Sequence, residues 1–256
     1  MAGRLAATLF VAALIVYSAY AALFIAPEEA TMGLIQRIFY FHVAAWASMF
    51  SAFYIAVFAN IAYLYTRSQK WDWLGVAAVE VGVVCCTIGL ITGPIWAHPV
   101  WGVWWTWDAR LTTTFLLWLL YIAYLLLRGL IDDPQRRALL SAVFGIFAFL
   151  DVPLVYFSNR LWRTTHPQPV ILGGENSGLD PTMGKVLALC ICALLGVTIL
   201  VLLSRYRLER LRHEFDELRF AVESRIESES GIESKSPNIL ESRAAGSQSN
   251  PGKAKP

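Results

Sequence analysis

The sequence predicts an all-α protein that crosses a membrane six times, and three observations support this fold class. First, 57% of the 256 residues are hydrophobic, 16% are charged and the mean hydropathy is +0.52, whereas soluble domains carry roughly 25% charged residues. Second, the apolar residues lie in long runs, and a run of about 20 spans a bilayer as a helix. Third, the connecting segments alternate between more and fewer Lys and Arg residues. The net charge of +2 gives no indication of nucleic-acid binding.

The apolar runs define six expected spans. They lie at about 5–26, 39–65, 74–96, 111–129, 138–158 and 186–204. The first run is longer than the roughly 7–15 residues of a signal-peptide core, so we expect it to be retained as a helix. The connecting segments richer in Lys and Arg include 67–70, 128–137 and 205–212. The positive-inside rule places these segments and both termini in the cytoplasm, and 27–38 and 159–185 outside.

Three regions follow along the chain. Residues 1–204 are predicted to form the transmembrane domain. Residues 205–226 carry apolar side chains three and four positions apart, which predicts an amphipathic helix for a partner or for the inner membrane surface. Residues 227–256 are rich in Ser, Glu, Gly and Pro without periodicity, which predicts disorder.

One stretch, WAHPVWGVWWTWDARLTTT at residues 96–114, holds five of the ten Trp residues and is called the Trp segment below. Pro94 is expected to end the preceding helix, which makes the Trp segment a loop at the outer membrane surface. An aromatic belt that anchors two helix ends is one interpretation. Such a belt needs only one or two Trp, so the density of this cluster favours an apolar platform for a flat ligand.

Two His residues are predicted on the same side of the membrane as the Trp segment. His42 begins the second span, with Trp46 on the same helix face four residues later, and His166 lies between spans five and six. Taken singly, each is typical of an interfacial anchor or a solvated loop His. Together with the Trp segment they suit a haem, whose iron takes imidazole ligands and whose macrocycle packs on indoles. Cations are available for the propionates; they are Arg110, Arg160 and Arg163.

Two acidic residues fall within predicted spans. Glu80 lies in the inner half of the third span, where a charge costs roughly 2.5–3.5 kcal/mol, so we expect it to face protein or to be protonated. Asp151 lies in the outer half of the fifth span, where Pro153 is expected to kink the helix. Asp151 is expected either to orient a group of the outer site or to pair with an outer Arg such as Arg37.

The motif WGVWWTWDARLT resembles the WWD signature of the haem-handling proteins of cytochrome c maturation, which include the CcmC, CcmF and CcsA types. The continuation DARLT is similar to CcmC. The segments RIFYFHV and WRTTHPQPV resemble those around the two haem-ligand His of that family. The resemblance covers roughly residues 30–205 and implies membership of the CcmC family.

This resemblance implies that the protein binds haem b at the outer face of the cell inner membrane and delivers it to the haem chaperone CcmE. The implied partners are CcmA, CcmB and CcmD, beside membrane lipid. His42 and His166 would be the axial ligands, and Arg110 and Arg163 would meet the propionates. The residues that would form the platform and hold the haem edge are Trp101, Trp104, Trp105, Trp107 and Asp108.

Other classes of protein remain as alternatives. The sequence contains neither a G-x-x-x-x-G-K-[ST] loop nor a nucleophile–base pair, so we expect a haem-transfer component rather than an enzyme. A haem lyase of the CcmF or CcsA type is the nearest alternative, and a membrane haem b redox protein is a more distant one. A scaffold whose Trp segment only docks a partner would bind no haem.

Overall fold

The structure is a computed structural model that describes the backbone of residues 2–162, 166 and 179–246, and the side chains of these residues as far as 227. In these ranges the elements are all helices. They are α1 (Ala2–Tyr20), η1 (Ala21–Ile25), η2 (Leu34–Arg37), α2 (Ile38–Thr66), α3 (Gln69–Trp101), α4 (Ala109–Leu130), α5 (Pro134–Phe149), α6 (Asp151–Leu161) and α7 (Pro181–Gly246). Six stretches are long and apolar enough to cross a membrane: Ala2–Ile25, Leu34–Thr66, Gln69–Trp101, Ala109–Leu130, Pro134–Leu161 and Pro181–Glu227. The predicted fold class, a six-span multi-pass membrane protein, is confirmed.

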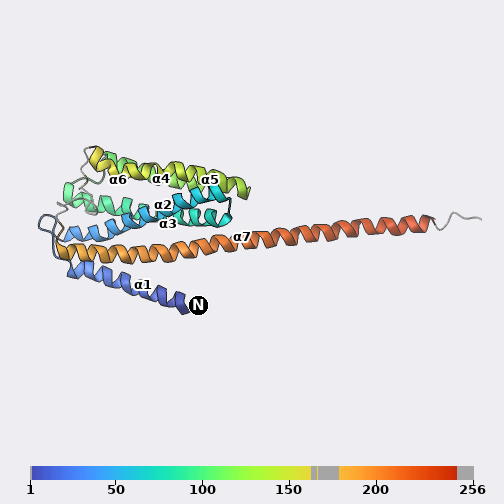
Figure 1. The fold of residues 1–256 in the computed structure, drawn as a ribbon, viewed down its shortest axis with the longest axis horizontal. Helices are drawn as coiled ribbons and strands as arrows, with labels where there is room; N and C mark the ends of the chain where they lie inside the picture. The colour runs from blue at the N-terminus through green and yellow to red at the C-terminus, as the bar shows by residue number, and fades with distance from the viewer. Residues whose placement is uncertain (1, 163–165, 167–178, 247–256) are drawn as a thin grey trace, which may run out of the picture. The chain divides into compact units, whose positions relative to one another are not determined.

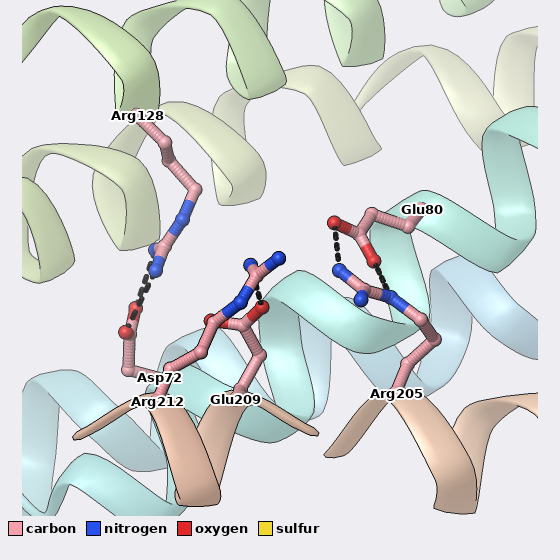
Figure 2. Close-up of polar contacts among 6 residues, drawn as sticks. All are labelled: Asp72, Glu80, Arg128, Arg205, Glu209 and Arg212. Carbon is pink, nitrogen blue, oxygen red and sulfur yellow. Dashed lines mark hydrogen bonds and ion pairs between the residues drawn. The ribbon is translucent and has the colours of Figure 1, made fainter. Parts of the chain in front are cut away.

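The chain divides into two compact units, residues 1–207 and 208–256. The first unit holds α1 to α6 and the start of α7. In the second unit α7 continues, with exposed apolar side chains such as Leu211 and Phe215. Ion pairs run along the same helix, for example between Glu209 and Arg212 at 2.9 Å (Figure 2). The predicted end of the transmembrane domain at residue 204 and the predicted end of the amphipathic helix at residue 226 stay predictions.

Helices α2 and α3 lie side by side at the centre of the first unit, with α4, α5 and α6 on one side of them and α1 with the start of α7 on the other (Figure 1). In lipid, small residues allow such close approach. A Cβ on Gly82 of α3 would lie 2.4 Å from Cε1 of Phe53 on α2. The Phe53 ring in turn stacks on Tyr121 of α4, with 3.9 Å between centroids and 11° between planes. These contacts fix α2, α3 and α4 against one another.

Prolines act differently in two of the spans. The fifth span breaks at Leu150 into α5 and α6, because Pro153 has no N–H for the carbonyl of Phe149. The expectation that Pro94 ends a helix is wrong, since α3 continues through Pro94 and Pro99 to Trp101. A helix in lipid has no water to satisfy freed backbone groups, which favours continuing the helix. Only residues 102–108 of the Trp segment therefore lie outside helices.

Gly102 ends α3. It adopts the left-handed conformation, with φ of +72°, and its N–H donates to the carbonyl of His98 at 2.9 Å. A side chain at this position would be strained, whereas glycine adopts it freely. The chain then turns through 102–108 and enters α4 at Ala109, which brings the remaining Trp residues back over the end of α3.

Two ion pairs lie toward the end of the first unit at which α3 begins; their side chains are drawn in Figure 2. Arg128, in the last turn of α4, donates to both carboxylate oxygens of Asp72, in the first turn of α3, at 2.6 and 2.9 Å. Arg205 of α7 donates to both oxygens of Glu80, with 2.6 Å between Nη2 and Oε1. Glu80 thus faces protein, and the two pairs tie α4 and α7 to α3.

Asp151 is a different case. Its side chain is buried, and neither carboxylate oxygen has a hydrogen-bond partner among the described residues. The pairing of Asp151 with Arg37 does not form, because the Arg37 guanidinium donates instead to the carbonyl of Leu23 at the end of the first span.

Candidate functional site

A cavity opens at the end of the bundle where α2 begins, α3 ends and α4 begins. Its volume is about 50 Å³. It brings together six residues singled out in the sequence: His42, His166, Trp101, Trp104, Trp105 and Arg110. The other lining residues are Trp46, Gly89, Leu90, Gly93, Pro94, Trp96, Ala97, Val103, Thr106, Leu111 and Thr114. Residues that are far apart in the sequence thus form one aromatic-walled pocket.

Hydrogen bonds hold the buried His42 imidazole on both sides. Its Nε2 lies 2.8 Å from Nε1 of Trp46, and its Nδ1 lies 2.8 Å from Oγ1 of Thr92. An indole N–H can only donate, so Nε2 must be the accepting nitrogen. The Thr92 hydroxyl donates to the carbonyl of Ile88 at 2.8 Å, so its oxygen accepts from Nδ1–H. This network assigns His42 as the neutral Nδ1–H tautomer.

Two glycines of α3 make room for the rings on α2. A Cβ on Gly89 would lie 2.9 Å from Cε2 and from Cζ2 of Trp46. A Cβ on Gly93 would lie 3.4 Å from Cε1 of His42. The imidazole also meets Trp96 edge-on, with 5.8 Å between ring centroids. His42 and Trp46 are therefore pressed against the backbone of α3, which limits how far either ring can move.

The Trp residues of the Trp segment divide between two hollows. Trp101, Trp104 and Trp105 line the cavity, although the side chain of Trp104 is 59% exposed. Trp107 does not line it; its side chain is 74% exposed and belongs to a neighbouring hollow that it shares with Trp105 and Trp118. His98 lies outside the cavity lining and stacks on Trp104, with 4.2 Å between centroids.

Asp108 and Arg110 have separate roles where the chain enters α4. Asp108 does not line the cavity; it caps α4 by accepting a hydrogen bond from the N–H of Leu111 at 3.0 Å. Arg110 does line it, in the first turn of α4. Its Nη1 is buried and has no hydrogen-bond partner among the described residues, as is also true of Nε1 of Trp105. Arg163 lies outside the described residues.

The cavity therefore combines imidazole nitrogens, indole faces and two buried donors for which the described part of the chain offers no partner. A buried donor left unpaired costs about 1–3 kcal/mol, so Arg110 and Trp105 favour a ligand with anionic or carbonyl oxygens. Indole walls favour a flat apolar body, and imidazoles favour a transition metal. A flat, metal-containing ligand with acidic groups meets all three requirements.

Neither Thr92 nor Trp96 was predicted individually as a site residue. For Trp46 a signal was present, because it follows His42 at a spacing of four on one helix. For Thr92 no local signal exists, since its contact with His42 joins two helices. Gly89 and Gly93 are four residues apart in the sequence, but this spacing alone does not tell that aromatic rings rather than a helix backbone lie on them.

Comparison with known proteins agrees with the predicted resemblance. A family model described as Heme exporter protein C matches residues 1–221. The curated Heme exporter protein C of Bradyrhizobium diazoefficiens is 31% identical over 217 residues, which cover 84% of this chain and 82% of the relative. Its namesake from Escherichia coli K12 is 30% identical over 186 residues, 71% of this chain and 73% of the relative. A putative cytochrome c biosynthesis ccmC-like mitochondrial protein from Marchantia polymorpha is 30% identical over 148 residues, 57% of this chain and 62% of the relative. The chain therefore belongs to the Heme exporter protein C (CcmC) family.

Proposed function

We propose that this protein binds haem b in the cavity, with His42 and His166 as the axial ligands, and hands it on for the maturation of c-type cytochromes. One observation carries the proposal. His42 and His166 come from distant parts of the chain and line the same Trp-walled cavity. Relatives named Heme exporter protein C support a role in haem export.

The residues present fit the chemical groups of a haem. Arg110 Nη1 and Trp105 Nε1 are buried donors without described partners, and propionate oxygens would satisfy them. Nε2 of His42 accepts a hydrogen bond and so carries no proton. It is the nitrogen that a haem iron takes. When bound, the iron supplies the two coordination bonds, and the chain supplies the ligands, the apolar walls and the countercharge.

The volume of the cavity limits how the haem is held. Pockets that bury most of a drug-sized ligand measure about 300–1,000 Å³, whereas this cavity measures about 50 Å³. Binding therefore requires the lining rings to part. The exposed Trp104 at the cavity wall would then leave one edge of the macrocycle accessible. An accessible edge suits a protein that passes the haem on rather than retaining it.

The further steps of the proposal concern location and partners. The protein acts in the cell inner membrane with both termini in the cytoplasm and the cavity on the outer face, as the distribution of Lys and Arg predicts. It presents haem to the chaperone CcmE and works with CcmA, CcmB and CcmD, as a transfer component rather than an enzyme. Asp108 contributes by capping α4, which fixes the position of Arg110.

We expect the detergent-purified protein to show the absorption spectrum of a low-spin haem in both oxidation states. Alanine at His42 or at His166 should abolish haem binding or turn the spectrum high-spin, because one axial ligand is lost. His98→Ala is the matched control, since His98 stacks on Trp104 outside the cavity lining. A spectrum that is unchanged in either cavity variant excludes that His as a ligand. No haem at all, even with the chaperone co-expressed, would favour a scaffold.

Arg110→Gln should weaken haem binding about 10- to 100-fold, because a hydrogen bond to a charged group contributes about 1.5–3 kcal/mol. The loss is measured by titrating the ligand-free protein with haem and with haem dimethyl ester, which has no free propionate. Wild type and Arg110→Gln should bind the ester equally. Arg160→Gln is the control, because the Arg160 guanidinium lies over the Tyr156 ring rather than in the cavity. Equal loss for haem and ester would show that Arg110 does not bind the propionates.

A further inference from the structure

The contact between Trp46 and His42 has a consequence for iron binding. The Nε2 lone pair of His42 is the one that a haem iron would take, and here it accepts the indole N–H of Trp46 at 2.8 Å. The other ring nitrogen donates to Thr92 and carries the proton. One lone pair cannot serve a hydrogen bond and an iron at once. Iron and the Trp46 N–H therefore compete for the same electron pair.

We propose that Trp46 is a latch on His42: its indole N–H holds Nε2 in the ligand-free protein and must leave before iron binds there. This inference rests on the proposed function, because it takes His42 as an axial ligand. Trp46 is thus a positioning residue, which acts on the haem through His42. The exchange breaks the N–H···N hydrogen bond and forms the Fe–N bond, and no proton has to leave the imidazole.

The surroundings of the latch support this role. Trp46 lies against Gly89, where even a methyl group would approach within 2.9 Å of the indole, so the ring is held in the position from which it donates. Thr92 keeps the proton on Nδ1, so Nε2 stays deprotonated whether Trp46 or iron occupies it. The small volume of the cavity, about 50 Å³, fits a latched form in which the rings have not yet parted.

The latch makes haem binding weaker than it would be with a free imidazole. The ligand-free form has the Trp46–His42 hydrogen bond. This bond must break when haem binds, and it forms again when haem leaves. For a neutral hydrogen bond the difference corresponds to about a 2- to 10-fold change in affinity. A transfer protein gains from this, since return of the latch aids release of haem from His42 to an acceptor.

The test compares Trp46→Phe, which removes the N–H and keeps an aromatic ring, with Trp118→Phe. Trp118 is a matched control because its indole N–H also donates to a side chain, in this case the Thr87 hydroxyl of α3 at 2.9 Å, outside the cavity lining. Two readouts are needed. The first is the affinity for haem, measured by titrating the ligand-free protein with haem. The second uses no haem: it is the ¹⁵N resonance of His42 Nε2 in ligand-free, ¹⁵N-His-labelled protein, assigned with His42→Ala.

Trp46→Phe should tighten haem binding about 2- to 10-fold and move the Nε2 resonance toward that of a free lone pair, while Trp118→Phe changes neither. Gly89→Ala is a second variant that displaces the Trp46 indole without removing it, and it should move the resonance in the same direction. Unchanged or weaker haem binding by Trp46→Phe would overturn the latch, yet would leave the proposed function standing if the spectrum still depends on His42. A spectrum independent of His42 would remove both proposals.

Discussion

Arg128→Ala is expected to lower the free energy of unfolding by about 3–5 kcal/mol, the typical cost of removing one partner from a buried ion pair. Arg128 and Asp72 form two hydrogen bonds at 2.6 and 2.9 Å (Figure 2), and their side chains are only 10% and 9% exposed. Without Arg128, the Asp72 carboxylate would remain buried without its bidentate counter-ion. The charges also suit their helices, since Asp72 lies in the first turn of α3 and Arg128 in the last turn of α4.

The measurement is the apparent melting temperature in detergent, followed by intrinsic Trp fluorescence. A loss of about 3–5 kcal/mol corresponds to a decrease of about 6–20 °C for a chain of this size. Arg136→Ala is the control, because Arg136 and Asp133 are exposed and 3.8 Å apart, and such pairs contribute about 0–1 kcal/mol. The double variant Asp72→Leu/Arg128→Met should recover most of the loss, since apolar replacement of a whole buried pair is often neutral. A melting temperature for Arg128→Ala equal to that of the control would contradict this account.

Gly82→Ala is expected to destabilise the protein by about 1–3 kcal/mol, although alanine favours helices over glycine by about 1 kcal/mol. The new methyl group would lie 2.4 Å from Cε1 and 2.6 Å from Cδ1 of Phe53. Phe53 cannot simply turn away, because its ring stacks on Tyr121 with 3.9 Å between centroids. Either α2 and α3 must separate or the Phe53–Tyr121 stack must shift.

Gly129→Ala is expected to change the stability in the opposite direction and serves as the matched control. Gly129 is also helical, near the end of α4, and a Cβ there would meet no atom within 4 Å. It should therefore leave the free energy of unfolding unchanged or raise it by up to about 1 kcal/mol, the difference in helix propensity. The melting temperature would stay the same or rise accordingly. An increase in melting temperature for both Gly82→Ala and Gly129→Ala would mean that helix propensity, rather than packing on Phe53, decides both results.

Several features of the site follow from local sequence. The approach of His42 and Trp46 is set by a spacing of four along one helix, which places two side chains on the same face. The capping of α4 by Asp108 likewise depends on residues within one turn. The six spans follow from the length of the apolar runs, because a buried apolar stretch in lipid has to be helical. The family resemblance rests on WGVWWTWDARLT, which is also contiguous.

Other features depend on how the helices pack. Pro94 predicted the end of a helix, but α3 continues to Trp101. The reason is that α2 packs against α3 and that lipid offers no hydrogen-bond partners for an unwound backbone. That Trp105 lines the cavity and Trp107 does not could not be foreseen, since both belong to the same short connection. Residues this close in sequence point in different directions only once α3 and α4 are placed.

Local sequence patterns were enough to predict the class of membrane protein and its six spans, and six of the predicted His, Trp and Arg residues line one cavity: His42, His166, Trp101, Trp104, Trp105 and Arg110. The tertiary structure alone decided that Thr92 fixes the tautomer of His42, that Gly89 supports Trp46, and that Arg128 and Arg205 pair with acidic residues of α3. The physical reason is the range of the interactions. Helix formation and capping depend on neighbours within about four residues, whereas contacts between helices depend on rotations and crossing distances that no local pattern specifies.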